Sequence, residues 1–229
     1  MSDTGENREY QANLEVLVSA RTEQLRHAVM ELEKSHDITL DALVHVLGLK
    51  HAEAARHSKR VTSYAIAIAR AMALPADEIR VIARGAFLHD IGKLATPEHI
   101  LLKPSSLSEA EIKVMRQHCV CGYETINRIP YLIEAAEIVY SHHEGYNGAG
   151  YPRGLKGDEI PVGARIVAVA NTLDSMTSNH AHRRRVSFSA ACDEISRCSG
   201  GQFDPLVVRV FLAMPENVWS DLRKDVERD

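Results

Sequence analysis

Histidines beside carboxylates are the side chains of this sequence best suited to chemistry. The chain of 229 residues holds 12 histidines. His89 and Asp90 are neighbours after an apolar run, and His142-His143-Glu144 stands directly before a glycine-rich segment. Mixed imidazole and carboxylate ligands suit iron, manganese or zinc at a hydrolytic centre better than calcium or a thiolate zinc site. These residues therefore predict a metal-dependent hydrolytic centre.

The positions of further histidines support this interpretation. Glu53 and His57 are four residues apart. On a helix their side chains lie on one face, where they can bind one metal or two neighbouring metals. His118 stands alone, and we expect it near the middle of a helix. By itself the His89-Asp90 pair would more often be structural than ligating, but the other histidines favour ligation.

The elements that must position these residues are predicted to be helices. Ser108 and Glu111 have the spacing of a capping box at a helix start. Residues 166–170 are compatible with a buried strand when taken alone, but their apolar neighbours extend the run beyond strand length. Residues 145–163 hold six glycines and two prolines, which predicts a structured loop. We expect an all-α fold with helices over residues 58–72, 75–88, 131–141, 162–178, 190–198 and 205–214.

The N-terminal residues 1–42 are predicted to form a long, coiled-coil-like signalling helix ahead of a domain over residues 43–229. A short heptad seam supports this, formed by Leu14, Val18, Leu25, Ala28 and Leu32. Arg21 and Ser35 occupy its other core positions, so the coiled coil is weak. A helix packed on its own domain is the alternative. We expect a parallel homodimer through residues 10–35.

Composition narrows the possible classes of protein. Hydrophobic residues make up 45% of the chain and charged residues 25%, which is ordinary for a globular protein. No stretch approaches the roughly 18–20 apolar residues that cross a bilayer. The polar start predicts no secretory leader, so we expect a cytoplasmic protein that is not in a membrane. The net charge of -4 argues against binding long nucleic acid or acidic lipid.

The four cysteines are expected to be free thiols, because they are few and irregularly spaced. Cys119 and Cys121 have a spacing that could bind a metal. No second pair completes such a site, so we interpret both as bystanders.

Together these motifs resemble the HD-GYP family, the group of HD-superfamily metal phosphohydrolases that cleave the bacterial messenger cyclic di-GMP. The resemblance covers about residues 43–214 and implies the HD-superfamily helical bundle. The segments that carry it are HDIGK at 89–93, TPEHILLKPSSLSEAE at 96–111, His118 with Gly122, HHEGYNGAGYPRGLKGDEIP at 142–161, ARIVAVANTLDSMTS at 164–178 and GGQFDPLVVRVF at 200–211.

The resemblance implies two or three divalent metal ions, iron or manganese in the first place, with nickel or zinc as alternatives. Asp90 would bridge two ions, and Glu53 would support a third. Asp90 and Lys93 are the implied catalytic residues. The implied metal ligands are Glu53, His57, His89, Asp90, His118, His142, His143 and Asn171.

Asn171 departs from the family, which has an aspartate at this position. A neutral amide oxygen in place of a bridging carboxylate should weaken one metal and acidify a bridging hydroxide less. His180 and His182 stand where the family has arginine and tyrosine, which weakens the implied contacts with phosphate and base. The arginines at 183–185 either substitute for them or form a solvated basic face.

Contacts with substrate are implied for Lys93, Tyr151, Asp174, His180 and Arg183. Lys93 is placed to meet a phosphate oxygen, and an exposed lysine at a helix end is its alternative. The Tyr151 ring could hold its loop on the core, stack on guanine or face a protein partner.

The expected function is hydrolysis of cyclic di-GMP to pGpG by metal-activated water, with continuation to GMP left open. One alternative is a catalytically weak or degenerate HD-GYP sensor or interaction module, which Asn171, His180 and His182 motivate. A related HD hydrolase acting on another nucleotide is a third possibility. The expected partners are cyclic di-GMP, a second copy of the chain, and receiver or diguanylate cyclase domain proteins in the bacterial cytoplasm.

Overall fold

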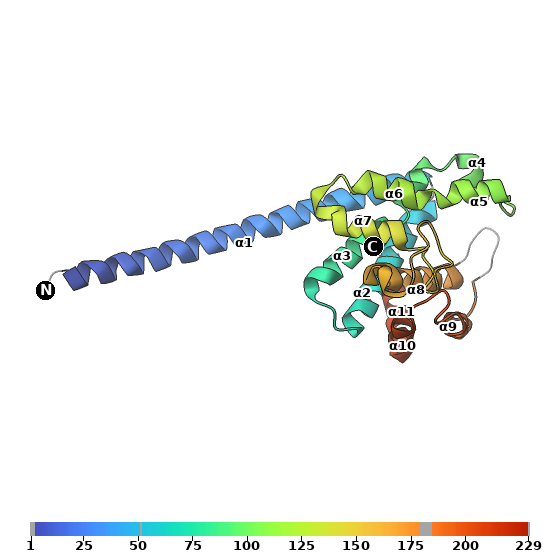
Figure 1. Ribbon diagram of the computed structural model, residues 1–229. Coiled ribbons are helices and arrows are strands. Elements are labelled where there is room, and N and C mark those ends of the chain that lie inside the picture. Colours follow the sequence, from blue (N-terminus) through green and yellow to red (C-terminus); the bar gives the residue numbers. More distant parts are fainter. Residues whose placement is uncertain (1–2, 51, 179–184, 229) are drawn as a thin grey trace. The chain divides into compact units, whose positions relative to one another are not determined.

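The computed structural model describes residues 3–50, 52–178 and 185–228, and within them it holds helices and no strand (Figure 1). The prediction of an all-α fold is confirmed. The α-helices are α1 (Asp3–Lys50), α2 (Ala52–Ala71), α3 (Ala76–Leu88), α4 (Glu98–Leu101), α5 (Glu109–Arg116), α6 (His118–Ile126), α7 (Ile133–Ser141), α8 (Val162–Thr177), α9 (Phe188–Arg197), α10 (Pro205–Ala213) and α11 (Glu216–Arg228). Short 3-10 helices are η1 (Ile91–Ala95), η2 (Pro130–Leu132) and η3 (Gly157–Glu159).

The chain divides into two compact units, Met1–Ala42 and Leu43–Asp229. The described residues of the first unit, 3–42, belong to helix α1. Its exposed apolar side chains include those of the expected seam: Leu14 at 41%, Val18 at 60%, Leu25 at 66% and Leu32 at 57%.

The core of the second unit forms where α2 packs against α3 and α8, and α11 also contacts α2. Val61, Ala65 and Ile68 of α2 follow the four-then-three spacing of one helical face, and all three are fully buried. Each large apolar side chain buried in this way contributes about 1.5–3 kcal/mol to folding. The apolar face of α2 thus packs into the core, and this packing fixes the positions of the polar residues of α2.

Close packing of α3 against α7 depends on Gly85. A Cβ atom at Gly85 would lie 2.7 Å from Cβ of Ile138 on α7, closer than side-chain atoms pack. The absence of a side chain lets the two helices approach. The same approach brings together the C-terminal ends of α3 and α7, which carry His89 and His142.

A second close approach joins η1 to α6. A Cβ atom at Gly92 would lie 1.9 Å from the carbonyl oxygen of His118 and 2.6 Å from the backbone nitrogen of Gly122. Only glycine fits this contact. It holds Asp90, just before η1, beside the first residue of α6.

The helix expected around His118 is interrupted in the structure. The capping box of Ser108 and Glu111 is confirmed at the start of α5, but α5 ends at Arg116 and His118 opens α6. At the break the N–H of Gln117 donates to the carbonyl of Val114, three residues back, over 3.1 Å. The expectation that His118 lies mid-helix is therefore wrong, because the chain tightens at Gln117.

Candidate metal centre

Three histidines at helix ends share one arrangement. In His89, His118 and His142 the Nδ1 atom lies 2.7–2.8 Å from a backbone carbonyl oxygen. A carbonyl only accepts, so Nδ1 carries the proton and Nε2 keeps its lone pair. The three accepting carbonyls, each three residues earlier in the chain, belong to Ala86, Met115 and Val139. This tether fixes each imidazole with a free Nε2 donor, as metal-binding histidines require.

His57 on α2 is also held through Nδ1, but its partner is a carboxylate and not a backbone carbonyl. Its Nδ1 lies 2.7 Å from Oδ2 of Asp174 on α8. Burial alone would raise the pKa of Asp174, but hydrogen bonds from His57 and Arg60 bring that pKa well below its ordinary value. The carboxylate is therefore ionised and accepts the Nδ1 proton. The Nε2 atom of His57 faces Asp90 instead, 3.9 Å from its Oδ2.

Asp90 stands between the histidines with its two oxygens turned to different neighbours. Its Oδ2 lies 3.5 Å from Nε2 of His89, and its Oδ1 lies 3.6 Å from Nε2 of His118. Lys93 donates to Oδ2 over 2.5 Å. Burial would raise the pKa of Asp90, but Lys93 and the surrounding histidines bring it well below its usual value. An ionised carboxylate thus joins two sides of the site.

The donor atoms form two groups around Asp90. His57, His89 and Asp90 make up one, and His118, Cys119, His142 and His143 make up the other; within each, one donor atom per residue lies within 4.8 Å of the rest. Burial lowers the pKa of His89 to about 4 and that of His143 to about 3, so these imidazoles are neutral, the form that binds metal.

Two observations show that divalent ions fit these groups. The Nε2 atoms of His118 and His142 lie 3.3 Å apart, and since both carry lone pairs, they repel each other unless a cation lies against them. The buried Nε2 of His89 has no hydrogen-bond partner in the structure. Buried polar atoms are rarely left in this state, and a cation in each donor group would satisfy these nitrogens.

Glu53 does not join either donor group. One carboxylate oxygen accepts from Arg56, with distances of 3.0 and 2.7 Å, and the other accepts from Arg60 over 2.8 Å. Glu53 lies in the wall of the same cavity as His57 and Asp90. Guanidinium groups hold both of its oxygens in this structure, and a direct ligand role for Glu53 stays a prediction.

Arg60 is a residue of the site that sequence reasoning missed. It is 4% exposed, and its guanidinium donates to Glu53 and, over 2.6 and 2.9 Å, to both oxygens of Asp174. The available signal was its position on α2, seven residues after Glu53 and three after His57, on the same helical face. A buried arginine needs such carboxylate partners.

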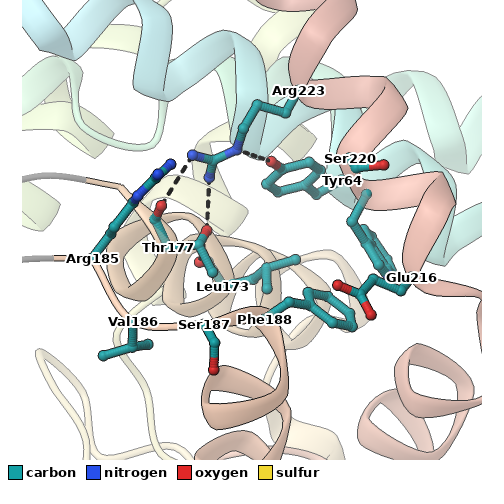
Figure 2. Close-up of a pocket in the computed structure, with 11 residues that line it drawn as sticks. Tyr64, Leu173, Thr177, Arg185, Val186, Ser187, Phe188, Glu216, Ser220 and Arg223 are labelled. Carbon is teal, nitrogen blue, oxygen red and sulfur yellow. Dashed lines mark hydrogen bonds between the residues drawn. The ribbon is translucent and has the colours of Figure 1, made fainter.

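Asp174 has a positioning role in the structure. It is fully buried, and both of its oxygens accept hydrogen bonds inside the protein. Arg223 of α11 also reaches its Oδ1, over 3.3 Å. Figure 2 shows this guanidinium beside Thr177 and the Tyr64 hydroxyl, at the edge of a cavity of about 390 Å³. Because its oxygens are buried and engaged, the structure assigns Asp174 to orienting His57 and Arg60, and its direct contact with substrate stays a prediction.

Two cavities open over the donor groups. One of about 320 Å³ is lined by His57, Asp90 and Lys93, among others. Another of about 590 Å³ is lined by polar groups that include Glu194 and Gln202. Both cavities share the residues His143, Asn171 and Ser175.

Asn171 therefore lies between the two cavities, beside the histidines. Its Oδ1 accepts a hydrogen bond from the Ser175 hydroxyl over 3.3 Å. The amide carries no charge, so it offers a cation less attraction than the aspartate of the family pattern would.

The glycine-rich loop is held against the donor groups by Tyr151 and Glu144. The Tyr151 ring stacks on His143 with centroids 4.9 Å apart, and the Arg116 guanidinium lies 4.7 Å from the centre of the same ring. The buried Glu144 carboxylate accepts from the backbone N–H groups of Arg153 and Leu155 over 2.7 and 3.2 Å. Of the three roles considered for Tyr151, the structure displays the one that holds the loop on the core.

The structure brings together His57, His89, Asp90, Lys93, His118, His142, His143, Asn171 and Tyr151 in and around one site. His180, His182, Arg183 and Arg184 lie outside the described residues.

A family model and several proteins of known name match the sequence of this chain. A family model described as "HD domain" matches residues 41–207. The cyclic di-GMP phosphodiesterase of Thermotoga maritima is 38% identical over 179 residues, which are 77% of this chain and 49% of that protein. The response regulator RpfG of Xanthomonas campestris, also named a cyclic di-GMP phosphodiesterase, is 34% identical over 83% of this chain and 51% of its own length. A 3'3'-cGAMP-specific phosphodiesterase of Vibrio cholerae is 32% identical over 74% of this chain and 33% of its own length.

Solved structures share the fold. Bd1817, an HD-GYP-type protein from Bdellovibrio bacteriovorus, aligns with a TM-score of 0.60 at 19% identity, over 78% of this chain and 62% of that chain. The chain therefore belongs to the HD-domain family and to its HD-GYP group. It spans about half the length of the Thermotoga and Xanthomonas relatives. Among the described residues, no helix combines the length and apolar character needed to cross a membrane.

Proposed function

We propose that this protein hydrolyses a cyclic dinucleotide, with cyclic di-GMP as the leading substrate and pGpG as the first product. The observation that carries the proposal is the Asp90 carboxylate, whose two oxygens face His89 on one side and His118 on the other. A shared carboxylate between two sets of imidazoles is suited to hold two divalent ions side by side. Relatives of 34–38% identity carry the name cyclic di-GMP phosphodiesterase.

Protein groups around the site have distinct parts in the proposed reaction. His57, His89 and Asp90 would hold one ion, and Asp90, His118, His142 and His143 would hold the other. Such ions supply an activated water and offset the charge that develops on the phosphoryl group. Lys93 lines the cavity over Asp90, where its ammonium can bind a phosphate oxygen. Tyr151 keeps His143 in place by stacking on it.

The two cavities support a substrate with two halves. They have volumes of about 320 and 590 Å³ and share His143, Asn171 and Ser175. A cyclic dinucleotide could place the reacting phosphate at this shared border and one nucleoside on each side. The larger cavity has Gln202 in its lining, a side chain that can pair with the edge of a nucleobase.

The direct test is turnover of purified protein with cyclic di-GMP, 3'3'-cGAMP and linear pGpG, followed by chromatography of the products. Preferred cleavage of cyclic di-GMP to pGpG supports the proposal. Preferred cleavage of 3'3'-cGAMP would move the substrate assignment to that of the Vibrio cholerae relatives. Cleavage of pGpG alone would contradict the proposal.

Asn171 motivates a second candidate function, a sensor that binds nucleotide or metal without useful turnover. The variant Asn171→Asp separates the two. A silent parent that gains a large rate in the variant supports the sensor, whereas an active parent with two ions per chain supports the enzyme.

The exposed apolar residues of α1 support a homodimer through residues 10–35. Light scattering before and after removal of residues 1–38 tests it, and a monomer in both cases would contradict it. A cytoplasmic location, contacts with receiver or diguanylate cyclase domains, and a choice of iron or manganese over nickel or zinc stay predictions.

A further inference from the structure

Cys119 lies in the second donor group, where sequence reasoning treated it as a bystander. Its side chain is fully buried, and its Sγ lies 3.5 Å from Nε2 of His118. The Sγ is also within 4.8 Å of donor atoms of His142 and His143. The nearby Cys121 is half-buried and belongs to neither donor group.

The distances in this group match those around a single ion. Zinc binds histidine nitrogen at about 2.1 Å and thiolate sulfur at about 2.3 Å, so a tetrahedral site separates two nitrogens by about 3.4 Å and nitrogen from sulfur by about 3.6 Å. The two Nε2 atoms of His118 and His142 lie 3.3 Å apart. The Sγ of Cys119 lies 3.5 Å from the first of them. These two distances match those between neighbouring corners of one coordination site, and the donor atoms of Cys119 and His142 lie within 4.8 Å of each other.

A hydrogen bond offers a less complete account of the same contact. The Cys119 thiol could donate its proton to the lone pair on Nε2 of His118, as a weak S–H donor. That proton would leave Nε2 of His142 facing another lone pair at 3.3 Å. One cation among the three atoms satisfies all of them at once.

We propose that Cys119 is a thiolate ligand of the ion that His118, His142 and His143 would hold together with Asp90. This inference rests on the metal centre of the proposed function. On binding, the thiol proton passes to the buffer and a sulfur lone pair is donated to the ion, because a thiol that coordinates a metal is deprotonated outright. A soft sulfur donor favours zinc, cobalt or iron over manganese, so this half of the centre should select against manganese.

Cobalt spectroscopy of the metal-free full chain tests the proposal. Titration with Co²⁺ should produce a near-ultraviolet thiolate-to-cobalt charge-transfer band, which Cys119→Ser loses and the matched control Cys121→Ser keeps. Visible cobalt absorption and far-ultraviolet circular dichroism verify that each variant is folded and still holds the ion. A wild-type protein that binds cobalt without the band, or a Cys119→Ser variant that retains it, would overturn the proposal.

Two measurements keep the test decisive if Cys119→Ser does not fold. X-ray absorption at the zinc edge of the wild-type protein should show a sulfur neighbour at about 2.3 Å, and a shell of nitrogen and oxygen alone would overturn the proposal. In competition between Zn²⁺ and Mn²⁺, Cys119→Ala should lower the bound ratio of zinc to manganese by about tenfold or more, and an unchanged ratio would contradict it.

These readouts do not depend on turnover. Hydrolysis without a sulfur signature would refute the ligand role of Cys119 and leave the proposed function intact. A sulfur signature in a protein that cleaves no cyclic dinucleotide would refute the function and leave the ligand in place.

Discussion

Nδ1 of His57 lies 2.7 Å from Oδ2 of Asp174, and this contact ties α2 to α8 across 117 positions of the sequence. The same carboxylate accepts from Arg60, which in turn holds Glu53. The chain of contacts fixes which nitrogen of His57 faces Asp90. Orientation of a ligand by a buried carboxylate is a common way to set its affinity for a metal.

We therefore predict that Asp174→Asn weakens both folding and metal binding. An amide would place an N–H₂ donor against either His57 or Arg60, and the buried guanidinium would lose most of its countercharge. The free energy of unfolding of the metal-free protein should fall by about 3 kcal/mol, as when a buried ion pair is broken. Metal affinity should fall about 10- to 100-fold.

Urea unfolding and metal titration measure these two effects. Asp158→Asn is the matched control, because that carboxylate is 89% exposed and its pairing with Arg165 is expected to contribute about 0.5 kcal/mol or less. If Asp174→Asn and the control have equal stability and equal metal affinity, the Asp174 contacts contribute to neither quantity, and the prediction is contradicted.

Gly92→Ala should move the two donor groups apart. The added Cβ would meet the carbonyl oxygen of His118 at 1.9 Å, so η1 must move away from α6. We expect a loss of about 3 kcal/mol in unfolding free energy, together with weaker metal binding. Differential scanning calorimetry and metal analysis provide the readout.

Gly201→Ala is the comparison variant for this substitution, since its Cβ would lie no closer than 3.5 Å to Cys198. It should leave both quantities close to the wild type. A Gly92→Ala protein as stable as Gly201→Ala would mean that the close approach of η1 and α6 is not required.

Lys93→Met should move turnover and metal affinity in opposite directions. The ammonium lies 2.5 Å from Oδ2 of Asp90, where it competes with cations. Without it, ions should bind Asp90 more tightly, while kcat/KM for cyclic di-GMP falls by about 100-fold because a positive charge near the phosphate is lost.

Isothermal titration with Mn²⁺ and steady-state kinetics test the two directions. The exposed Lys113→Met serves as the control and should change neither quantity. If Lys93→Met binds ions more weakly, or keeps its kcat/KM, the assigned part of Lys93 is wrong.

Sequence reasoning anticipated the helical fold and the residues that lie together at the site. Helical spacing predicts α2, and the HD-GYP motifs single out histidines that the structure does gather around Asp90. Local patterns could not show the break at Gln117, because residues 109–121 hold no glycine or proline to mark it.

Contacts between distant segments were the part that sequence could not supply. The carboxylate of Asp174 was expected to meet substrate, yet it binds His57 and Arg60 inside the core. Arg60 has no motif of its own, and its partner lies 114 positions away. Cys119 follows His118 directly, and neighbours on a helix point about 100° apart, so their shared approach to one site is visible only in three dimensions.

Metal analysis of anaerobically prepared wild-type protein and its Asp90→Asn variant tests the central claim most directly. If one carboxylate joins two ion sites, the wild type binds two or more divalent ions per chain. The variant then binds at most one, because a neutral amide cannot serve both groups. A variant that keeps the wild-type number of ions, or a wild type that binds none, would contradict the account.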